Sequence, residues 1–146
     1  MSFDPSTMLG KIDADQLEAL VETMYLAADA DGEFSPSELQ QLAESIRALA
    51  RNSEHQAALA GDNLTALLER ASAELGRDGR EARLAAVRSR LGEEGARKAA
   101  FGLAVMVTAA DGIMRTSERE FILDLAEALD LDRDDAADAV RELTRG

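Results

Sequence analysis

Two stretches of the sequence end in the same dipeptide. Residues 25–32 read Tyr-Leu-Ala-Ala-Asp-Ala-Asp-Gly, and residues 105–112 read Val-Met-Val-Thr-Ala-Ala-Asp-Gly. In both copies an apolar helical pattern leads into Asp-Gly, an apolar residue follows two positions later, and a glutamate stands six positions after the glycine. The sequence therefore predicts that a helix–loop–helix unit occurs twice, once as Asp31-Gly32…Glu38 and once as Asp111-Gly112…Glu118.

Apolar residues recur with helical spacing on both sides of each loop. Before the first loop, Asp13 and Gln16 are a predicted capping box that opens a helix, and Gly32 is its predicted end. After the loop, Ser35 is the predicted N-cap of a second helix, and Glu38 closes its box. The other predicted boundaries are glycine stops and one aspartate cap, at Gly76, Gly92, Gly112 and Asp132.

The whole chain is predicted to be a single all-α domain of about seven helices over residues 1–146, with residues 1–12 as a loose N-terminal arm. Hydrophobic residues make up 46% of the sequence and aromatic residues only 3%. Alanine, leucine and valine must therefore form the core, and such side chains suit closely packed helices. Alternating β-branched runs, which predict strands, do not occur.

Charge and composition exclude several classes of function. The net charge of −13 repels nucleic acid and anionic lipid. Apolar runs are too short for a membrane span, and the absence of cysteine excludes disulfides and zinc–thiolate sites. We therefore expect a cytoplasmic protein. The basic stretch at residues 77–98 is predicted to be a solvated face paired with acidic groups; a docking patch for an acidic partner is the alternative.

The candidate functional residues are the carboxylates of the two units, namely Asp29, Asp31, Glu38, Asp111 and Glu118. The aspartates follow helices whose carboxyl ends are negative, so each costs about 0.3–1 kcal/mol unless a bound cation or an arginine from elsewhere offsets it. In the second copy Arg115 replaces Ser35, and the cap is predicted to shift to Thr116 or Ser117. Glu118 then lacks the capping role that explains Glu38.

Neither loop is an EF-hand. The first has Ala27 where the first calcium ligand belongs, and the second has Val107 and Ala109 at the first and third ligand positions. Carboxylates pooled from both loops could still hold Ca²⁺, Mg²⁺ or Mn²⁺. An all-oxygen ligand set argues against zinc and copper.

Both units, each between two amphipathic helices, resemble the duplicated pattern of the tellurite-resistance TerB-like family. They are also similar to the N-terminal domain of a membrane-anchored DnaJ-like chaperone. The likeness extends from Leu17 to Leu143. It implies a compact all-α fold in the cytoplasm, peripheral to the inner membrane. It also implies a protein partner in a stress or metal-response assembly, and an acidic divalent-metal site at Asp31, Glu38, Asp111 and Glu118. Asp29 matches Ala109 and has no acidic counterpart.

Three functions remain open from the sequence: a non-enzymatic metal-binding module, a protein-binding scaffold whose loops are only structural, and an enzyme that uses paired carboxylates. We expect no enzymatic activity. The single histidine, His55, has no serine or cysteine motif beside it, so it is predicted to be solvated and not catalytic.

Overall fold

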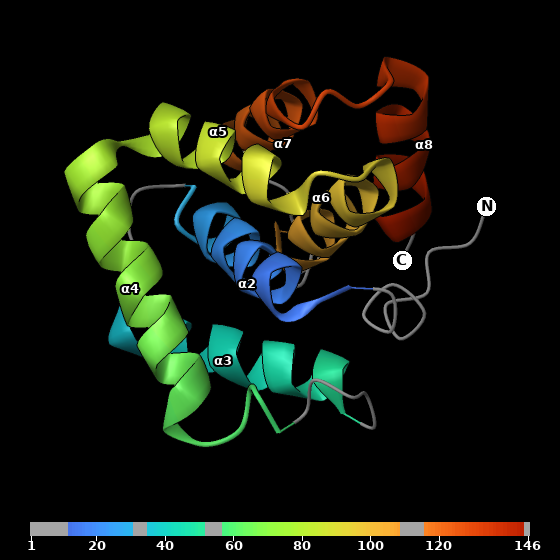
Figure 1. Ribbon diagram of the computed structural model, residues 1–146. Coiled ribbons are helices and arrows are strands. Elements are labelled where there is room, and N and C mark those ends of the chain that lie inside the picture. The colour runs from blue at the N-terminus through green and yellow to red at the C-terminus, as the bar shows by residue number, and fades with distance from the viewer. Residues whose placement is uncertain (1–11, 31–34, 52–56, 109–115, 145–146) are drawn as a thin grey trace.

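The computed structural model describes residues 12–30, 35–51, 57–108 and 116–144. These residues form helices and no strand, as the sequence predicts (Figure 1). The helices are α2 (Ala14–Ala28), α3 (Pro36–Ala50), α4 (Asp62–Asp78), α5 (Arg80–Leu91), α6 (Glu94–Thr108), α7 (Thr116–Ala128) and α8 (Arg133–Thr144). None of them is long and apolar enough to cross a membrane.

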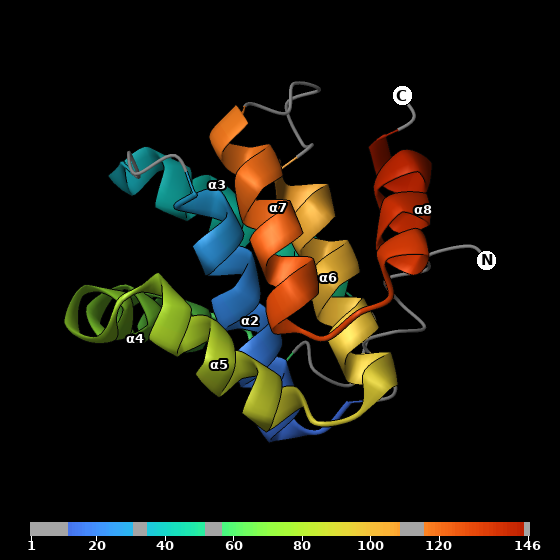
Figure 2. The ribbon, with the colours of Figure 1, turned by 90° about the horizontal axis from the view of Figure 1, so that it is seen from above.

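Helix α2 lies at the centre, with α4 and α3 on one side of it and α6 and α7 on the other (Figures 1 and 2). Ten of its fifteen residues are buried. A helix buried around most of its circumference must be apolar on most faces, and the buried residues of α2 are apolar except Glu22 and Thr23. Helix α6 packs along α2, and its buried residues include small ones such as Ala100 and Ala104, which suit close packing of helices.

Capping side chains start the helices where the sequence predicts. Asp13 and Gln16 form the box that opens α2, and Ser35 and Glu38 form the box that opens α3. Asp132 accepts backbone N–H bonds from the first turn of α8 at 2.8 and 3.3 Å. These predictions are confirmed, because a side-chain oxygen before a helix satisfies donors that the helix itself leaves unpaired.

Among the predicted glycine stops, the one at Gly92 is correct. Helix α2 ends at Ala28 with Asp29 as its C-cap, before the predicted stop at Gly32. The predicted stop at Gly112 lies outside the described residues, which break off after Thr108 of α6. Helix α4 continues through Gly76 and ends at Gly79, because only Gly79 adopts the positive φ, 86°, that turns the chain into α5. Of the predicted loose arm, only Ile12 is described, and its side chain is buried.

We predict opposite effects for alanine at the two glycines of α4. A Cβ at either position meets nothing within 4 Å, so only the backbone decides. Gly79→Ala should lower the free energy of unfolding by about 1–3 kcal/mol, since its backbone conformation is nearly exclusive to glycine. Gly76→Ala should raise it by about 0.5–1 kcal/mol. Urea denaturation measures both free energies of unfolding. If Gly79→Ala left the free energy of unfolding unchanged, the turn between α4 and α5 would not depend on the positive φ of Gly79.

Candidate functional site

The predicted site residues divide between described and undescribed parts of the chain. Asp31 and Asp111 lie outside the described residues. Asp29 is described and half-buried, and its backbone N–H donates to the carbonyl oxygen of Tyr25 at 3.0 Å. As the C-cap of α2, Asp29 places a carboxylate at the negative end of that helix.

Glu38 has a clear structural role. One of its carboxylate oxygens accepts hydrogen bonds from the Ser35 hydroxyl at 3.0 Å and from the Ser35 backbone N–H at 3.4 Å. The backbone N–H of Glu38 in turn donates to the Ser35 hydroxyl at 3.2 Å. This reciprocal arrangement is the capping box, and it accounts for Glu38 without a ligand.

Glu118 occupies the equivalent helical position. Thr116 and Ser117 are the first described residues of α7, and both are helical. The prediction that one of them is the N-cap is therefore wrong. Glu118 is therefore the third residue of α7, as Glu38 is the third residue of α3. A carboxylate in a first turn interacts favourably with the positive end of the helix, so Glu118 also has a structural reason for its place.

The two helices that enter the loops pack side by side. Helices α2 and α6 run in the same direction, and their carboxyl ends, at Ala28 and Thr108, point toward the same side of the molecule (Figure 2). Helix α7 begins on that side as well (Figure 2). The last described residues before the first Asp-Gly sequence and those before the second thus lie on one side of the molecule.

An arginine from another helix contacts the end of α2. The Arg80 side chain on α5 donates from Nη2 to the carbonyl oxygen of Ala30 at 3.3 Å. Its guanidinium carbon also lies 5.3 Å from the centroid of the Phe121 ring on α7. Arg80 therefore supplies positive charge at a helix end that has no basic residue in its own last turn.

The donor chemistry of the two units suits a hard divalent cation, since every candidate ligand is a carboxylate. Among the described residues, however, no three acidic or histidine side chains are grouped closely enough to hold a metal ion. Asp29, Glu38 and Glu118 do not make a site by themselves. Asp31 and Asp111 would have to complete it.

A second polar cluster joins α2, α4 and α5. Its centre is a buried ion pair, in which Arg83 donates from Nε and Nη2 to the two carboxylate oxygens of Glu22 at 2.6 and 2.8 Å. The exposed fractions are 8% for Arg83 and 5% for Glu22. Arg83 also lies 2.6 Å from a carboxylate oxygen of Glu74 and 3.2 Å from one of Asp78.

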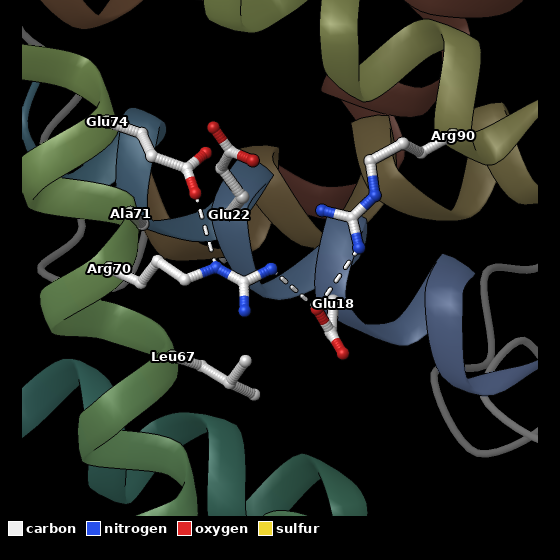
Figure 3. Close-up of a pocket in the computed structure, with 7 residues that line it drawn as sticks. All are labelled: Glu18, Glu22, Leu67, Arg70, Ala71, Glu74 and Arg90. Atoms are coloured by element: carbon white, nitrogen blue, oxygen red, sulfur yellow. Dashed lines mark hydrogen bonds and ion pairs between the residues drawn. The ribbon is translucent and has the colours of Figure 1, made fainter. Parts of the chain in front are cut away.

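Further ion pairs extend this cluster along α2. Figure 3 shows Arg70 of α4 between Glu74 and Glu18, and Arg90 of α5 on the opposite side of Glu18. The cleft between them has about 10 Å³ of free space, roughly the room for one water molecule. Since its arginines and carboxylates are paired with one another, the cluster is a structural joint and not a ligand site.

Sequence reasoning did not find this joint. The central pair connects residues 61 positions apart, so no local spacing indicates it. The predicted pairing of the basic stretch with acidic groups is confirmed for five of its seven basic residues, namely Arg77, Arg83, Arg88, Arg90 and Lys98. Arg80 and Arg97 instead donate to backbone carbonyl groups, and Arg83 is buried and not solvated as predicted. The alternative, a docking patch for an acidic partner, stays a prediction.

The described residues form an all-α domain of a strongly acidic chain, in which α2 and α6 lie side by side with their carboxyl ends on one side. The family model of tellurite resistance protein TerB matches residues 18–142, which is most of the chain. The chain belongs to the TerB family, as its resemblance predicted. No curated protein and no solved structure matches it. The similarity to a DnaJ-like chaperone domain stays a prediction.

We predict that Arg83→Ala lowers the free energy of unfolding by about 3–5 kcal/mol, because it leaves the buried Glu22 carboxylate unpaired. The matched control is Arg141→Ala, which breaks an exposed pair with Asp138 and should cost less than about 1 kcal/mol. The double variant Glu22→Leu/Arg83→Met should recover most of the loss. Urea denaturation measures these free energies of unfolding. Equal losses in Arg83→Ala and Arg141→Ala would show that the buried pair of Arg83 and Glu22 is no more important for stability than an exposed pair.

The pH dependence of stability should report Asp78. Hydrogen bonds from Arg77 and then Arg83 lower the pKa of Asp78 from 3.8 to about 2. Because the pKa of Asp78 is lower in the folded than in the unfolded chain, its ionised form stabilises the fold. This contribution is complete at a pH above the unfolded pKa and is lost as the pH falls to the folded pKa. The difference in unfolding free energy between the natural chain and Asp78→Asn should therefore be constant from pH 7 to about 5 and shrink between about 4 and 2. In an Arg77→Ala background the pKa of folded Asp78 is less depressed, so the decline should be smaller and should be complete at a higher pH.

Proposed function

We propose that this TerB-family domain is a non-enzymatic module that binds a divalent cation, Ca²⁺, Mg²⁺ or Mn²⁺, through carboxylates of both Asp-Gly…Glu units. In this proposal it acts in the cytoplasm, within a tellurite or metal-stress response assembly and with a protein partner at the inner membrane. The link to tellurite rests on the description of the family.

The packing of α2 against α6 carries the proposal. These helices lead into the two Asp-Gly sequences and run in the same direction, so their carboxyl ends point to one side (Figure 2). Hard cations take several oxygen ligands, and neither loop alone has enough carboxylates. Two loops that leave the same side could pool theirs, with water and backbone carbonyls completing the shell.

A protein-binding scaffold is the second candidate, and the capping box of Glu38 favours it. Because Ser35 already uses the carboxylate of Glu38, this residue needs no metal to explain its place. Arg80 likewise offsets charge at the end of α2 without a bound ion. In this alternative the loops serve structure, and binding of a partner is unaffected by chelator or by Asp31→Ala/Asp111→Ala.

Thermal unfolding with each cation at millimolar concentration tests the metal proposal. A cation present at about 100 times its Kd should raise the midpoint by about 5–10 °C, and EDTA should reverse the rise. The rise should vanish in Asp31→Ala/Asp111→Ala. Asp124→Ala/Asp138→Ala is the matched control, since it removes two carboxylates outside the loops and should keep the rise.

Glu38→Gln separates the ligand role of this residue from its cap role. Glutamine can still close the capping box, so the stability without metal should change little. The metal-induced rise should fall if the Glu38 carboxylate is a ligand. The metal proposal would be wrong if millimolar cations gave no shift, or if the shift survived the loss of both Asp31 and Asp111.

A further inference from the structure

A single residue separates α4 from α5. Helix α4 ends at Asp78, α5 begins at Arg80, and Gly79 caps both helices. The φ of 86° and ψ of 161° at Gly79 lie in a region of backbone conformation that only glycine adopts readily. The sharp bend between the two helices (Figure 1) therefore depends on the backbone of one residue.

The residues on both sides of this bend are suited to one continuous helix. Helix α4 is regular up to Asp78, and no side chain caps the first turn of α5. If Gly79 adopted helical dihedral angles, the first N–H groups of α5 would find acceptors in the last carbonyl groups of α4. A straight helix would thus gain backbone hydrogen bonds that the bend leaves out.

The bend also divides the described part of the chain into two halves that bury each other. Helices α2, α3 and α4 precede it, and helices α5 to α8 follow it. Helix α2 packs against α5 and α6 across this division. The buried pair of Glu22 and Arg83 crosses it, and so does the pair of Glu18 and Arg90. Each half therefore needs the other half to cover its apolar surface and to pair its charges.

We propose that the domain exchanges these halves with a second copy of itself, and that Gly79 is the hinge. In the exchanged dimer α4 and α5 form one straight helix in each copy. The first half of each copy packs on the second half of the other, so the pair of Glu22 and Arg83 recurs between the copies. The bent monomer and the exchanged dimer then differ mainly in the conformation of Gly79 and in the entropy lost on association.

The backbone at Gly79 determines how far the dimer is favoured. A Cβ at this position meets nothing within 4 Å, so alanine acts there only through the backbone. In the bent monomer the strain of alanine corresponds to a factor of at least about 5 in an equilibrium constant. Because one dimer removes two bends, Gly79→Ala should strengthen dimerisation by at least about 30-fold.

Light scattering after size-exclusion chromatography tests the hinge in chains refolded from urea in about 0.15 M salt, which screens the repulsion between acidic copies. Two halves joined by a short linker have an effective concentration on the order of 1 mM, so refolding at about that chain concentration lets a second copy compete. The natural chain should give a dimer there and a monomer on dilute refolding. Gly79→Ala should give the dimer at a chain concentration at least about 30-fold lower.

Gly76→Ala is the matched control for the hinge. It makes the same substitution inside α4, where the monomer and the dimer have the same helical backbone, so its dimer fraction should equal that of the natural chain. If Gly79→Ala formed no more dimer than Gly76→Ala, Gly79 would not be the hinge. Absence of a dimer from the natural chain at the higher concentration would confine the exchange to the variant and would also overturn the proposal.

Charge reversal distinguishes exchanged halves from contact between surfaces. One chain carries Glu22→Arg and the other carries Arg83→Glu, so each monomer buries two like charges and should be poorly folded alone. When the two chains exchange halves, opposite charges meet at both buried pairs. Refolding the mixture should therefore give a dimer that contains one copy of each chain, shown by native mass spectrometry, with a higher thermal midpoint than either chain alone.

The mixing experiment has two outcomes that contradict the exchange. If the mixture unfolds at the same temperatures as the separate chains, the halves of one copy do not pack on those of another. A mixed dimer without a rise in the thermal midpoint would show association through surfaces, because such contact leaves the like charges together within each chain.

Discussion

The carboxylate of Glu22 is buried on the most enclosed helix of the domain, and the arrangement around it follows from that constraint. An unpaired charge in such a place is strongly unfavourable, so a cation must reach it from another element. Arg83 does so from α5, with two hydrogen bonds to Glu22 and further contacts to Glu74 and Asp78 of α4. The pKa of Arg83 rises because its charged form donates to Glu22. This pairing fixes how α4 and α5 sit on α2.

The rest of the core contributes buried apolar area but constrains the relative orientation of the helices less. The buried residues of α2 and α6 include many alanines and leucines, which allow close approach but accept several registers. A bidentate arginine–carboxylate pair has one favourable geometry. The pair between Glu22 and Arg83 therefore selects one of the arrangements that the apolar surfaces permit, and the positive φ of Gly79 lets α5 turn back to make it.

The fold could largely be predicted because its signals are local. Helical periodicity and the capping residues Asp13, Ser35 and Asp132 lie within a few positions of the boundaries they set. The predicted stops at Gly32 and Gly76 failed because glycine is also tolerated inside a helix or beyond its end. Only backbone conformation, as at Gly79, distinguishes these cases. The ion pair of Glu22 could not be predicted, since its partner is distant in the sequence and its burial depends on the assembled fold.

The candidate site could be predicted as a set of residues but not as a geometry. The spacing of Glu38 and Glu118 after their glycines corresponds to the same position in α3 and α7. Spacing alone did not reveal that Ser35 engages Glu38, nor which arginine approaches α2. The sequence indicated that an arginine from another part of the chain could compensate the negative charge of the aspartates, but it did not indicate which arginine. Arg80 has that place through a contact that depends on how α5 crosses α2 and α7.

Several arginine side chains form internal contacts, and the charge that remains on the chain governs how fast the protein associates with other molecules. Arg83 is enclosed, and Arg90 and Arg97 are partly covered while they bind carboxylates or helix-end carbonyls. The chain has 29 acidic and 16 basic residues, and each internal ion pair removes one charge of either sign, so a net charge of −13 remains. Two copies repel each other at low ionic strength, and a basic surface is drawn in faster than diffusion alone would bring it. Encounter rates with such a surface therefore fall steeply as salt rises, even where the final contact is unchanged.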